Sequence, residues 1–274
     1  MTNDKVYSGA KLGFIGVGNM GGALVRAARK NTPSTCICVA NRSPEKAAAL
    51  SKEIPCRVMS NTELAVWANY LFLGVKPQMM RELLTEIASV LAERKDRFIL
   101  VTMAAGLSMS DILDMSGGEY PILRIMPNTP AAIGEGMILY TRGPGVTDAE
   151  ERLFLDAMSG AGRFSAISEN LMDAGSAIAG CGPAYVDLFI EALADGGVAC
   201  GLPRARAMEF AAQMVVGSAR LILESGQHPG ALKDAVCSPG GTTIQGVRKL
   251  EEAGFRGAVM NAVIAACEKN TQLK

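Results

Sequence analysis

The chain has 274 residues, 27 basic and 27 acidic side chains, and a hydrophobic fraction of 49%. This length predicts two domains that can each bury a core, and the apolar fraction excludes general disorder. The zero net charge argues against a nucleic-acid partner.

The first half of the sequence alternates short apolar runs with helical patterns. Strands are expected at residues 12–15, 36–40, 57–59, 70–75, 98–103, 120–126, 136–140 and 163–167. Helices are expected at about residues 20–30, 44–50, from 62 onward and 80–91, with Ser43 and Asn61 as N-caps of the second and third. Strands separated by helices of this length predict an α/β fold with a doubly wound, mainly parallel sheet.

Beyond Ser168 the strand signals stop and Ala-rich helical stretches follow. These are expected at about residues 169–179, 184–200, 204–223, 243–253 and 255–269. Breaks such as Gly180–Pro183 contain Gly and Pro, which do not readily continue a helix. We therefore place a domain boundary near residue 167, followed by an all-helical domain over residues 168–274.

A glycine-rich loop directly follows the first expected strand and opens the first expected helix. Its residues are Gly16, Val17, Gly18, Asn19, Met20 and Gly21, a complete Gly-x-Gly-x-x-Gly. In such a loop the first glycine permits the turn, the second lets the backbone approach a pyrophosphate, and the third packs helix on strand. The helix N-terminus also attracts the anion. The placement predicts a Rossmann-type dinucleotide-binding domain over residues 1–167, with a purely structural glycine turn as the alternative.

The end of the second expected strand bears on the choice of coenzyme. An NAD-binding unit carries Asp or Glu there for the ribose 2′-hydroxyl, but this chain has Asn41, Arg42 and Ser43. An Arg with Asn and Ser donors binds a 2′-phosphate through charge-assisted hydrogen bonds. NADPH is therefore favoured, NADH is the alternative coenzyme, and a solvated loop charge is the competing interpretation of Arg42.

The most unusual stretch of the second half is Ser238–Thr243, with the sequence Ser-Pro-Gly-Gly-Thr-Thr. It predicts a sharp turn that ends at a helix N-terminus. Free amides and hydroxyls there could converge on a carboxylate. Ordinary capping between two helices explains the same residues equally well.

The segment Leu232–Phe255, with this turn at its centre, resembles the signature of the Δ1-pyrroline-5-carboxylate reductase family. In the expected order, the chain also resembles that family at Gly16–Gly21, Val75–Pro77, Arg124–Pro130 and Gly180–Tyr185. The resemblance implies an oxidoreductase that reduces L-1-pyrroline-5-carboxylate to L-proline by hydride transfer from NAD(P)H, the final step of proline biosynthesis. It also implies a helical substrate and dimerisation domain that intertwines with a second copy, in dimers that commonly assemble into decamers.

The resemblance further implies roles for individual residues. The substrate carboxylate would be bound by Ser238, Gly240, Gly241, Thr242 and Thr243. Thr243 is also the candidate to hydrogen-bond the ring nitrogen, with water as an alternative proton source. The coenzyme would be contacted by Asn61, Val75, Lys76, Pro77 and Ala104. Lys76 would lie near the reacting atoms and, with Thr243, is a candidate catalytic residue; a surface lysine is the alternative.

For the remaining reactive or polar residues, structural roles are favoured over catalysis or metal binding. His228, the only histidine, lies in a turn, where a structural role is favoured over catalysis. One histidine and dispersed cysteines predict no metal site. The loop at Asn128 and Thr129 would lie beside the coenzyme or serve only structure.

The expected cellular compartment follows from features that the sequence lacks. No uninterrupted apolar run reaches the roughly 18 residues of a membrane span, and Met1–Gly9 lacks the layout of a signal peptide. The seven cysteines include no Cys-x-x-Cys pair, which predicts a cytoplasmic protein with reduced thiols and no membrane partner. A related imine or 2-hydroxyacid dehydrogenase and an NADPH-binding sensor without turnover are the alternative functions.

Overall fold

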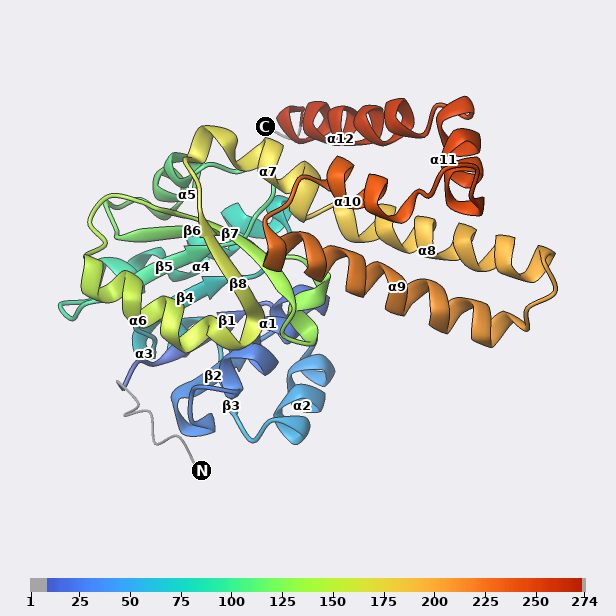
Figure 1. The fold of residues 1–274 in the computed structure, drawn as a ribbon. Helices are drawn as coiled ribbons and strands as arrows, with labels where there is room; N and C mark the ends of the chain where they lie inside the picture. The colour runs from blue at the N-terminus through green and yellow to red at the C-terminus, as the bar shows by residue number, and fades with distance from the viewer. Residues whose placement is uncertain (1–8, 273–274) are drawn as a thin grey trace. The chain divides into compact units, whose positions relative to one another are not determined.

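Eight strands form one sheet within residues 9–272, the part of the chain that this computed structural model describes (Figure 1). The strands are β1 (Leu12–Ile15), β2 (Ile37–Ala40), β3 (Arg57–Val58), β4 (Tyr70–Leu73), β5 (Ile99–Thr102), β6 (Ile122–Met126), β7 (Gly136–Arg142) and β8 (Gly162–Ala166). Their order is β3-β2-β1-β4-β5-β6-β7-β8, and the β6–β7 pair alone among them is antiparallel. The predicted doubly wound, mainly parallel sheet is confirmed. Residues 1–8, where no targeting signal is expected, lie outside the described residues.

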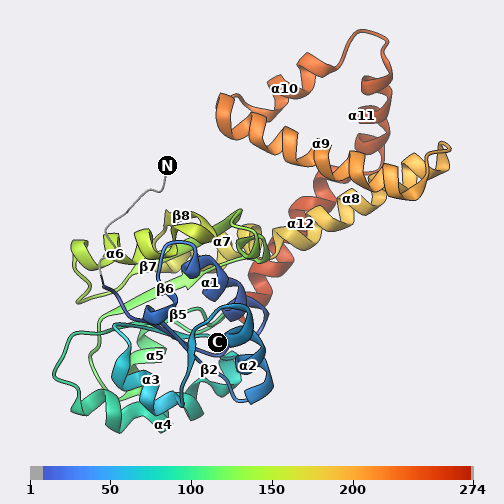
Figure 2. The ribbon, with the colours of Figure 1, turned by 90° about the horizontal axis from the view of Figure 1, so that it is seen from below.

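Helices cover both faces of the sheet (Figure 2). They are α1 (Asn19–Arg29), α2 (Pro44–Glu53), α3 (Asn61–Trp67), α4 (Pro77–Glu93), α5 (Met109–Ser116) and α6 (Asp148–Met158). Helices α1, α2 and α6 share one core with Phe14 and Phe72, whose rings stack with centroids 4.1 Å apart. Helices α3, α4 and α5 share the other core with Ile15 and Leu73. Because strand side chains alternate between faces, strands buried on both sides are apolar throughout, as the short apolar runs predicted.

Two details of the helices differ from the sequence expectations. Helix α3 is capped by Ser60 rather than Asn61, because Ser60 and Glu63 form a reciprocal capping box. Asn61 is the first residue of the helix instead. Helix α5 was not expected, and a second capping box, between Ser108 and Asp111, marks its start.

The C-terminal part of the chain is helical, as expected. It contains α7 (Met172–Ala179), α8 (Gly182–Ala199), α9 (Arg204–Ser225), α10 (Pro229–Val236), α11 (Thr242–Glu252) and α12 (Phe255–Thr271). Helices α8 and α9 pack closely through small residues, since Ala194, Ala207 and Ala211 are their buried side chains. An ion pair between Asp195 and Arg204, 2.5 Å apart, joins the two helices next to their connecting turn.

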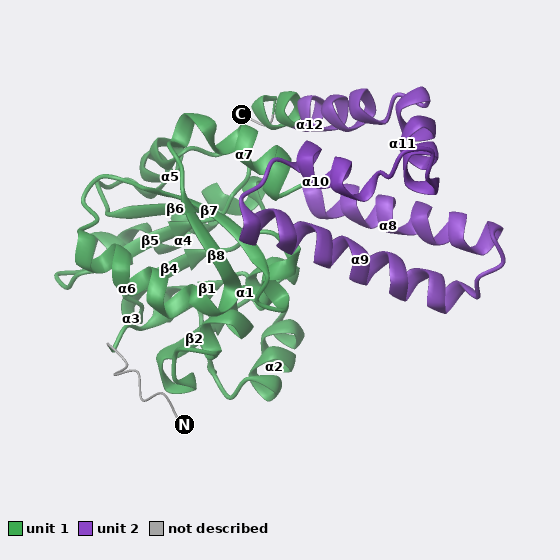
Figure 3. Cartoon of the chain, viewed as in Figure 1, with its two compact units in different colours: residues 1–181, 267–274 green, residues 182–266 purple. Residues whose placement is uncertain are grey.

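The chain divides into two compact units, Met1–Cys181 with Cys267–Lys274, and Gly182–Ala266 (Figure 3). Helix α7 belongs to the first unit, because Met172 packs against Met126 and Leu139 of the sheet. The two compact units therefore separate after Cys181. The expected boundary near residue 167 instead marks the point where the strands end and the helices begin. By length and composition alone, Glu169–Ala199 is apolar enough to cross a membrane, and a turn at Gly180 and Cys181 divides it.

Candidate active site

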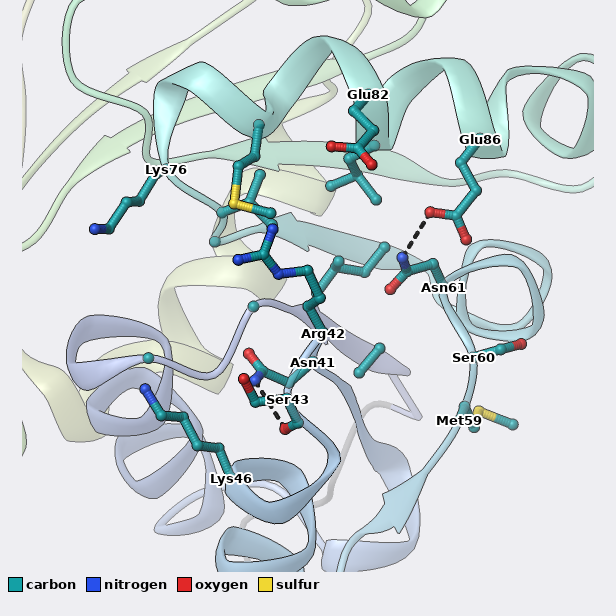
Figure 4. Close-up of a pocket in the computed structure, with 18 residues that line it drawn as sticks. Asn41, Arg42, Ser43, Lys46, Met59, Ser60, Asn61, Lys76, Glu82 and Glu86 are labelled. Carbon is teal, nitrogen blue, oxygen red and sulfur yellow. Dashed lines mark hydrogen bonds between the residues drawn. The ribbon is translucent and has the colours of Figure 1, made fainter.

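A pocket of about 550 Å³ lies at the carboxyl edge of the parallel strands (Figure 4). Residues that follow β1, β2, β3 and β4 line it, and α4 supplies one wall. In the strand order, β1 stands between β2 and β4, so the chain winds in opposite directions on either side of the pocket. Such a switch point is where doubly wound sheets bind nucleotides.

The pocket brings together most of the residues that were predicted from the sequence to bind a coenzyme. Those that line it are Gly16, Gly18, Asn41, Arg42, Ser43, Asn61, Val75 and Lys76. The others, Val17, Asn19, Met20, Gly21, Pro77 and Ala104, are not among its lining residues. Ala104 follows β5 and is 3% exposed, and Pro77 is the first residue of α4.

The three glycines of the loop meet different constraints. Gly16 has a φ of +93°, and a Cβ there would lie 2.6 Å from backbone atoms of Gly74. A Cβ on Gly21 would lie 2.0 Å from the carbonyl oxygen of Gly16, so α1 can approach β1 only with glycine at this position. A Cβ on Gly18 would meet nothing within 4 Å among the described residues. The open space beside Gly18 fits a pyrophosphate drawn against the backbone.

Asn41 connects the glycine loop to the loop after β2. Its Oδ1 accepts from the Val17 backbone N–H at 3.0 Å, and its Nδ2 donates to the Ser43 carbonyl oxygen at 3.0 Å. The Asn41 side chain therefore fixes the glycine loop against the loop after β2. The sequence analysis did not predict this structural role. The neighbouring Arg42 side chain is exposed and extends into the pocket (Figure 4).

The pocket has cationic and anionic sides. Arg42 and Lys46 come from the β2–α2 connection and the first turn of α2, and Lys76 precedes α4. Glu82 and Glu86 project from α4 (Figure 4). The sequence analysis did not predict Lys46, which lies in the first turn of α2 directly after the Asn41–Ser43 loop.

Helices α1 and α4 both begin at the pocket. Neither N-cap residue, Gly18 or Lys76, receives a side-chain hydrogen bond from its helix. The first-turn amides of α1 and the positive ends of both helix dipoles therefore remain available to a bound anion. Helix α4 offers fewer free amides, because Pro77 has no N–H and the Met79 N–H donates to the Lys76 carbonyl oxygen at 2.9 Å. The donor-rich edge suits the pyrophosphate of a dinucleotide.

The predicted substrate turn lies in the second unit. Gly240 has a φ of +70°, and the Gly241 N–H donates to the Ser238 carbonyl oxygen at 3.0 Å. A Cβ on Gly241 would lie 2.3 Å from the Ser238 Oγ, so the serine side chain would have to move to accommodate it. Gly241 is the N-cap of α11, and Thr242 and Thr243 are its first two residues, both exposed. The turn thus ends in a helix N-terminus that carries two hydroxyls, as predicted.

Two other residues singled out in the sequence have structural contacts. His228 is the N-cap of α10, and its Nδ1 accepts from the Gly230 backbone N–H at 3.1 Å. The Asn128 Oδ1 accepts from the Met137 N–H at 3.0 Å, while its Nδ2 donates to the Ala179 carbonyl oxygen at 2.9 Å. Within residues 9–272, no group of three or more His, Cys, Asp or Glu side chains is placed to hold a metal ion.

Comparisons with known proteins match both parts of the chain. Residues 169–273 match the model of the pyrroline-5-carboxylate reductase dimerisation family, and residues 11–106 match that of NADP oxidoreductase, coenzyme F420-dependent. The pyrroline-5-carboxylate reductase of Escherichia coli K12 is 43% identical over 267 residues, 96% of this chain and 98% of that protein. The Arabidopsis thaliana enzyme of the same name is 40% identical over 96% of this chain and 95% of its own length.

Solved structures agree. The crystal structure of Plasmodium falciparum pyrroline carboxylate reductase with NADP bound has a TM-score of 0.86 and 35% identity, and the match covers 96% of this chain and 98% of that one. A single relative thus matches the sheet, the glycine loop and the helical region of this chain at once. The chain belongs to the pyrroline-5-carboxylate reductase family.

Proposed function

We propose that the chain reduces L-1-pyrroline-5-carboxylate to L-proline, the final step of proline biosynthesis, with NADPH as the preferred coenzyme. The observation that carries the proposal is the similarity to reductases of this name over 96% of the chain, which leaves neither unit unmatched. When bound, the coenzyme supplies a hydride to the imine carbon. The ring nitrogen takes up a proton, so the C=N bond becomes a C–N bond.

The coenzyme preference rests on charge. Arg42 and Lys46 place two cations on the pocket side that follows β2, where a 2′-phosphate would lie. Ser43 adds a hydroxyl donor, and Asn41 holds this loop against the glycine loop. Asn61, Val75, Lys76, Pro77 and Ala104 are proposed along the rest of the coenzyme, with Lys76 nearest the reacting atoms.

The substrate turn would hold the carboxylate. Ser238, Gly240, Gly241 and Thr242 would bind it through hydroxyls and the first amides of α11, because a helix N-terminus stabilises an anion. Thr243 would orient the ring nitrogen by a hydrogen bond, and water is the alternative proton source. Orientation of this kind can supply several kcal/mol of the barrier, so little acid–base machinery is needed.

The match to a dimerisation family supports self-association. We extend this to an intertwined homodimer, with further assembly into decamers, in which residues 168–274 form the substrate and dimerisation domain. A cytoplasmic location fits the set of dispersed thiols.

The experiment that tests the function measures loss of NADPH absorbance with pyrroline-5-carboxylate and identifies proline as the product. Parallel assays use NADH, piperideine carboxylate and 2-hydroxy acids. Imine-dependent oxidation with proline formed supports the proposal. Turnover of another substrate alone would favour a related dehydrogenase, and tight NADPH binding without turnover would favour a sensor.

A further inference from the structure

The α4 wall of the coenzyme pocket contains a hydrogen bond that the proposed reaction does not explain. The Asn61 Nδ2 donates to the Glu86 Oε2 at 2.8 Å. Asn61 is the first residue of α3, Glu86 lies in the middle of α4, and both line the pocket. The bond therefore joins two helices at the point where they border the candidate coenzyme site.

A carboxylate partner determines which way the amide points. An Asn side chain offers donors at Nδ2 and an acceptor at Oδ1, and a half-turn exchanges them. An ionised carboxylate accepts only, so Glu86 selects the orientation in which Nδ2 faces α4. Figure 4 shows the result: the amide nitrogen points to Glu86, and the amide oxygen points into the pocket on the side of Arg42.

We propose that Glu86 is a positioning residue that holds the Asn61 Oδ1 toward the coenzyme, where it accepts a hydrogen bond from a ribose hydroxyl. The inference rests on the proposed function in so far as the pocket binds a nicotinamide coenzyme. A neutral acceptor at this contact recognises a hydroxyl without setting a full negative charge against the phosphates of the coenzyme. Glu86 acts through Asn61, so its loss should change coenzyme affinity far more than turnover.

A reversal of the hydrogen bond tests the proposal. Asn61→Asp replaces the donor by a second carboxylate facing Glu86, so the dissociation constants for NADPH and NADH should both rise about tenfold. Glu86→Gln lets the amide turn either way and should raise both about threefold. In the double variant Asn61→Asp with Glu86→Gln, Gln donates and Asp accepts, which leaves an Asp oxygen facing the pocket. Its dissociation constant for NADH should return to within about threefold of wild type, whereas that for NADPH should recover less, because the Asp charge then lies against the 2′-phosphate.

The matched control is Glu93→Gln, which removes the same charge from the same helix at an exposed position outside the pocket lining. It should leave the dissociation constants unchanged. Coenzyme fluorescence titration gives binding, thermal melting confirms that each variant folds, and steady-state kinetics separates KM from kcat. For the variants at Asn61 and Glu86, the KM for coenzyme should change while kcat stays within about twofold.

Additive losses in the double variant, or unchanged coenzyme binding in Glu86→Gln and Asn61→Asp, would overturn the proposal. The result is separable from the proposed function. Wild-type protein that binds coenzyme but does not reduce the imine refutes only the substrate assignment. Wild-type turnover together with no rescue in the double variant refutes only the role of Glu86.

Discussion

At the scale of single residues, the glycine loop separates glycines required by the fold from one required by a ligand. Gly21→Ala should destabilise the protein by about 1–3 kcal/mol, since its Cβ would lie 2.0 Å from the carbonyl oxygen of Gly16. Gly18→Ala should fold normally, because its backbone is extended and its Cβ would meet no atom within 4 Å. It should nevertheless weaken coenzyme binding more than about tenfold, because the pyrophosphate needs that space. Melting curves and coenzyme titration test both, and normal binding by Gly18→Ala would contradict this reading of the loop.

The two cations beyond β2 make a second prediction at this scale. Arg42→Gln and Lys46→Gln should each raise the KM for NADPH about tenfold, because each removes a charge-assisted hydrogen bond to the 2′-phosphate. The KM for NADH should change less than about twofold, since NADH lacks that phosphate. Steady-state kinetics with both coenzymes provides the measurement. Equal changes for both would mean that these side chains contact the shared pyrophosphate or only solvent.

At the scale of secondary-structure elements, the N-terminus of α6 is tied to the chain before β5 by an ion pair. Arg97 Nε donates to Glu150 Oε1 at 2.6 Å, and the Thr147 N–H and hydroxyl each donate to Glu150 Oε2 at 2.8 Å. The hydrogen bond from Arg97, aided by those from Thr147, lowers the pKa of Glu150 from 4.5 to about 2. A carboxylate whose folded pKa is lowered stabilises the fold above its unfolded pKa, and that stability is lost as the pH falls.

Glu150→Gln should therefore be less stable than wild type at neutral pH. The difference in melting temperature should shrink as the pH falls from about 4.5 and disappear near 2, because the wild-type carboxylate becomes protonated over that interval. Glu53→Gln breaks the exposed Arg26–Glu53 pair and should have a much smaller effect at every pH. A constant difference between wild type and Glu150→Gln across the titration would refute the assignment.

The N-termini of the helices show what the local sequence can predict and what it cannot. Pro44 and Pro77 open α2 and α4, where a first-turn proline is favoured. The sequence predicts the cap of α3 one residue too late, because Ser60 and Asn61 are both good caps and only the reciprocal bonds with Glu63 distinguish them.

At the scale of the whole molecule, the helices of residues 182–266 expose many large apolar side chains, and α10 and α11 contain no buried residue. Apolar surface of this extent marks an interaction site, and the match to a dimerisation family supports self-association through it. The protein should therefore elute with a mass that is an even multiple of 28.7 kDa.

Leu188→Glu and Leu223→Glu, at side chains that are 67% and 70% exposed, should dissociate this assembly and abolish turnover. Val66→Glu places the same charge at an exposed apolar residue of α3 and should leave the mass unchanged. Light scattering coupled to size exclusion measures all three. A wild-type monomer would contradict the proposed assembly.

The sequence by itself determined the sheet, the glycine loop, the helical second half and the turn at Ser238–Thr243, because these depend on local periodicity and on glycines and prolines with few alternative uses. Tertiary structure alone decided that α7 joins the first unit, through Met172 against Leu139. It alone set Asn41 against Val17 and Asn61 against Glu86. These contacts join residues from different elements, and side-chain pairing across elements depends on how the helices pack on the sheet rather than on any local pattern.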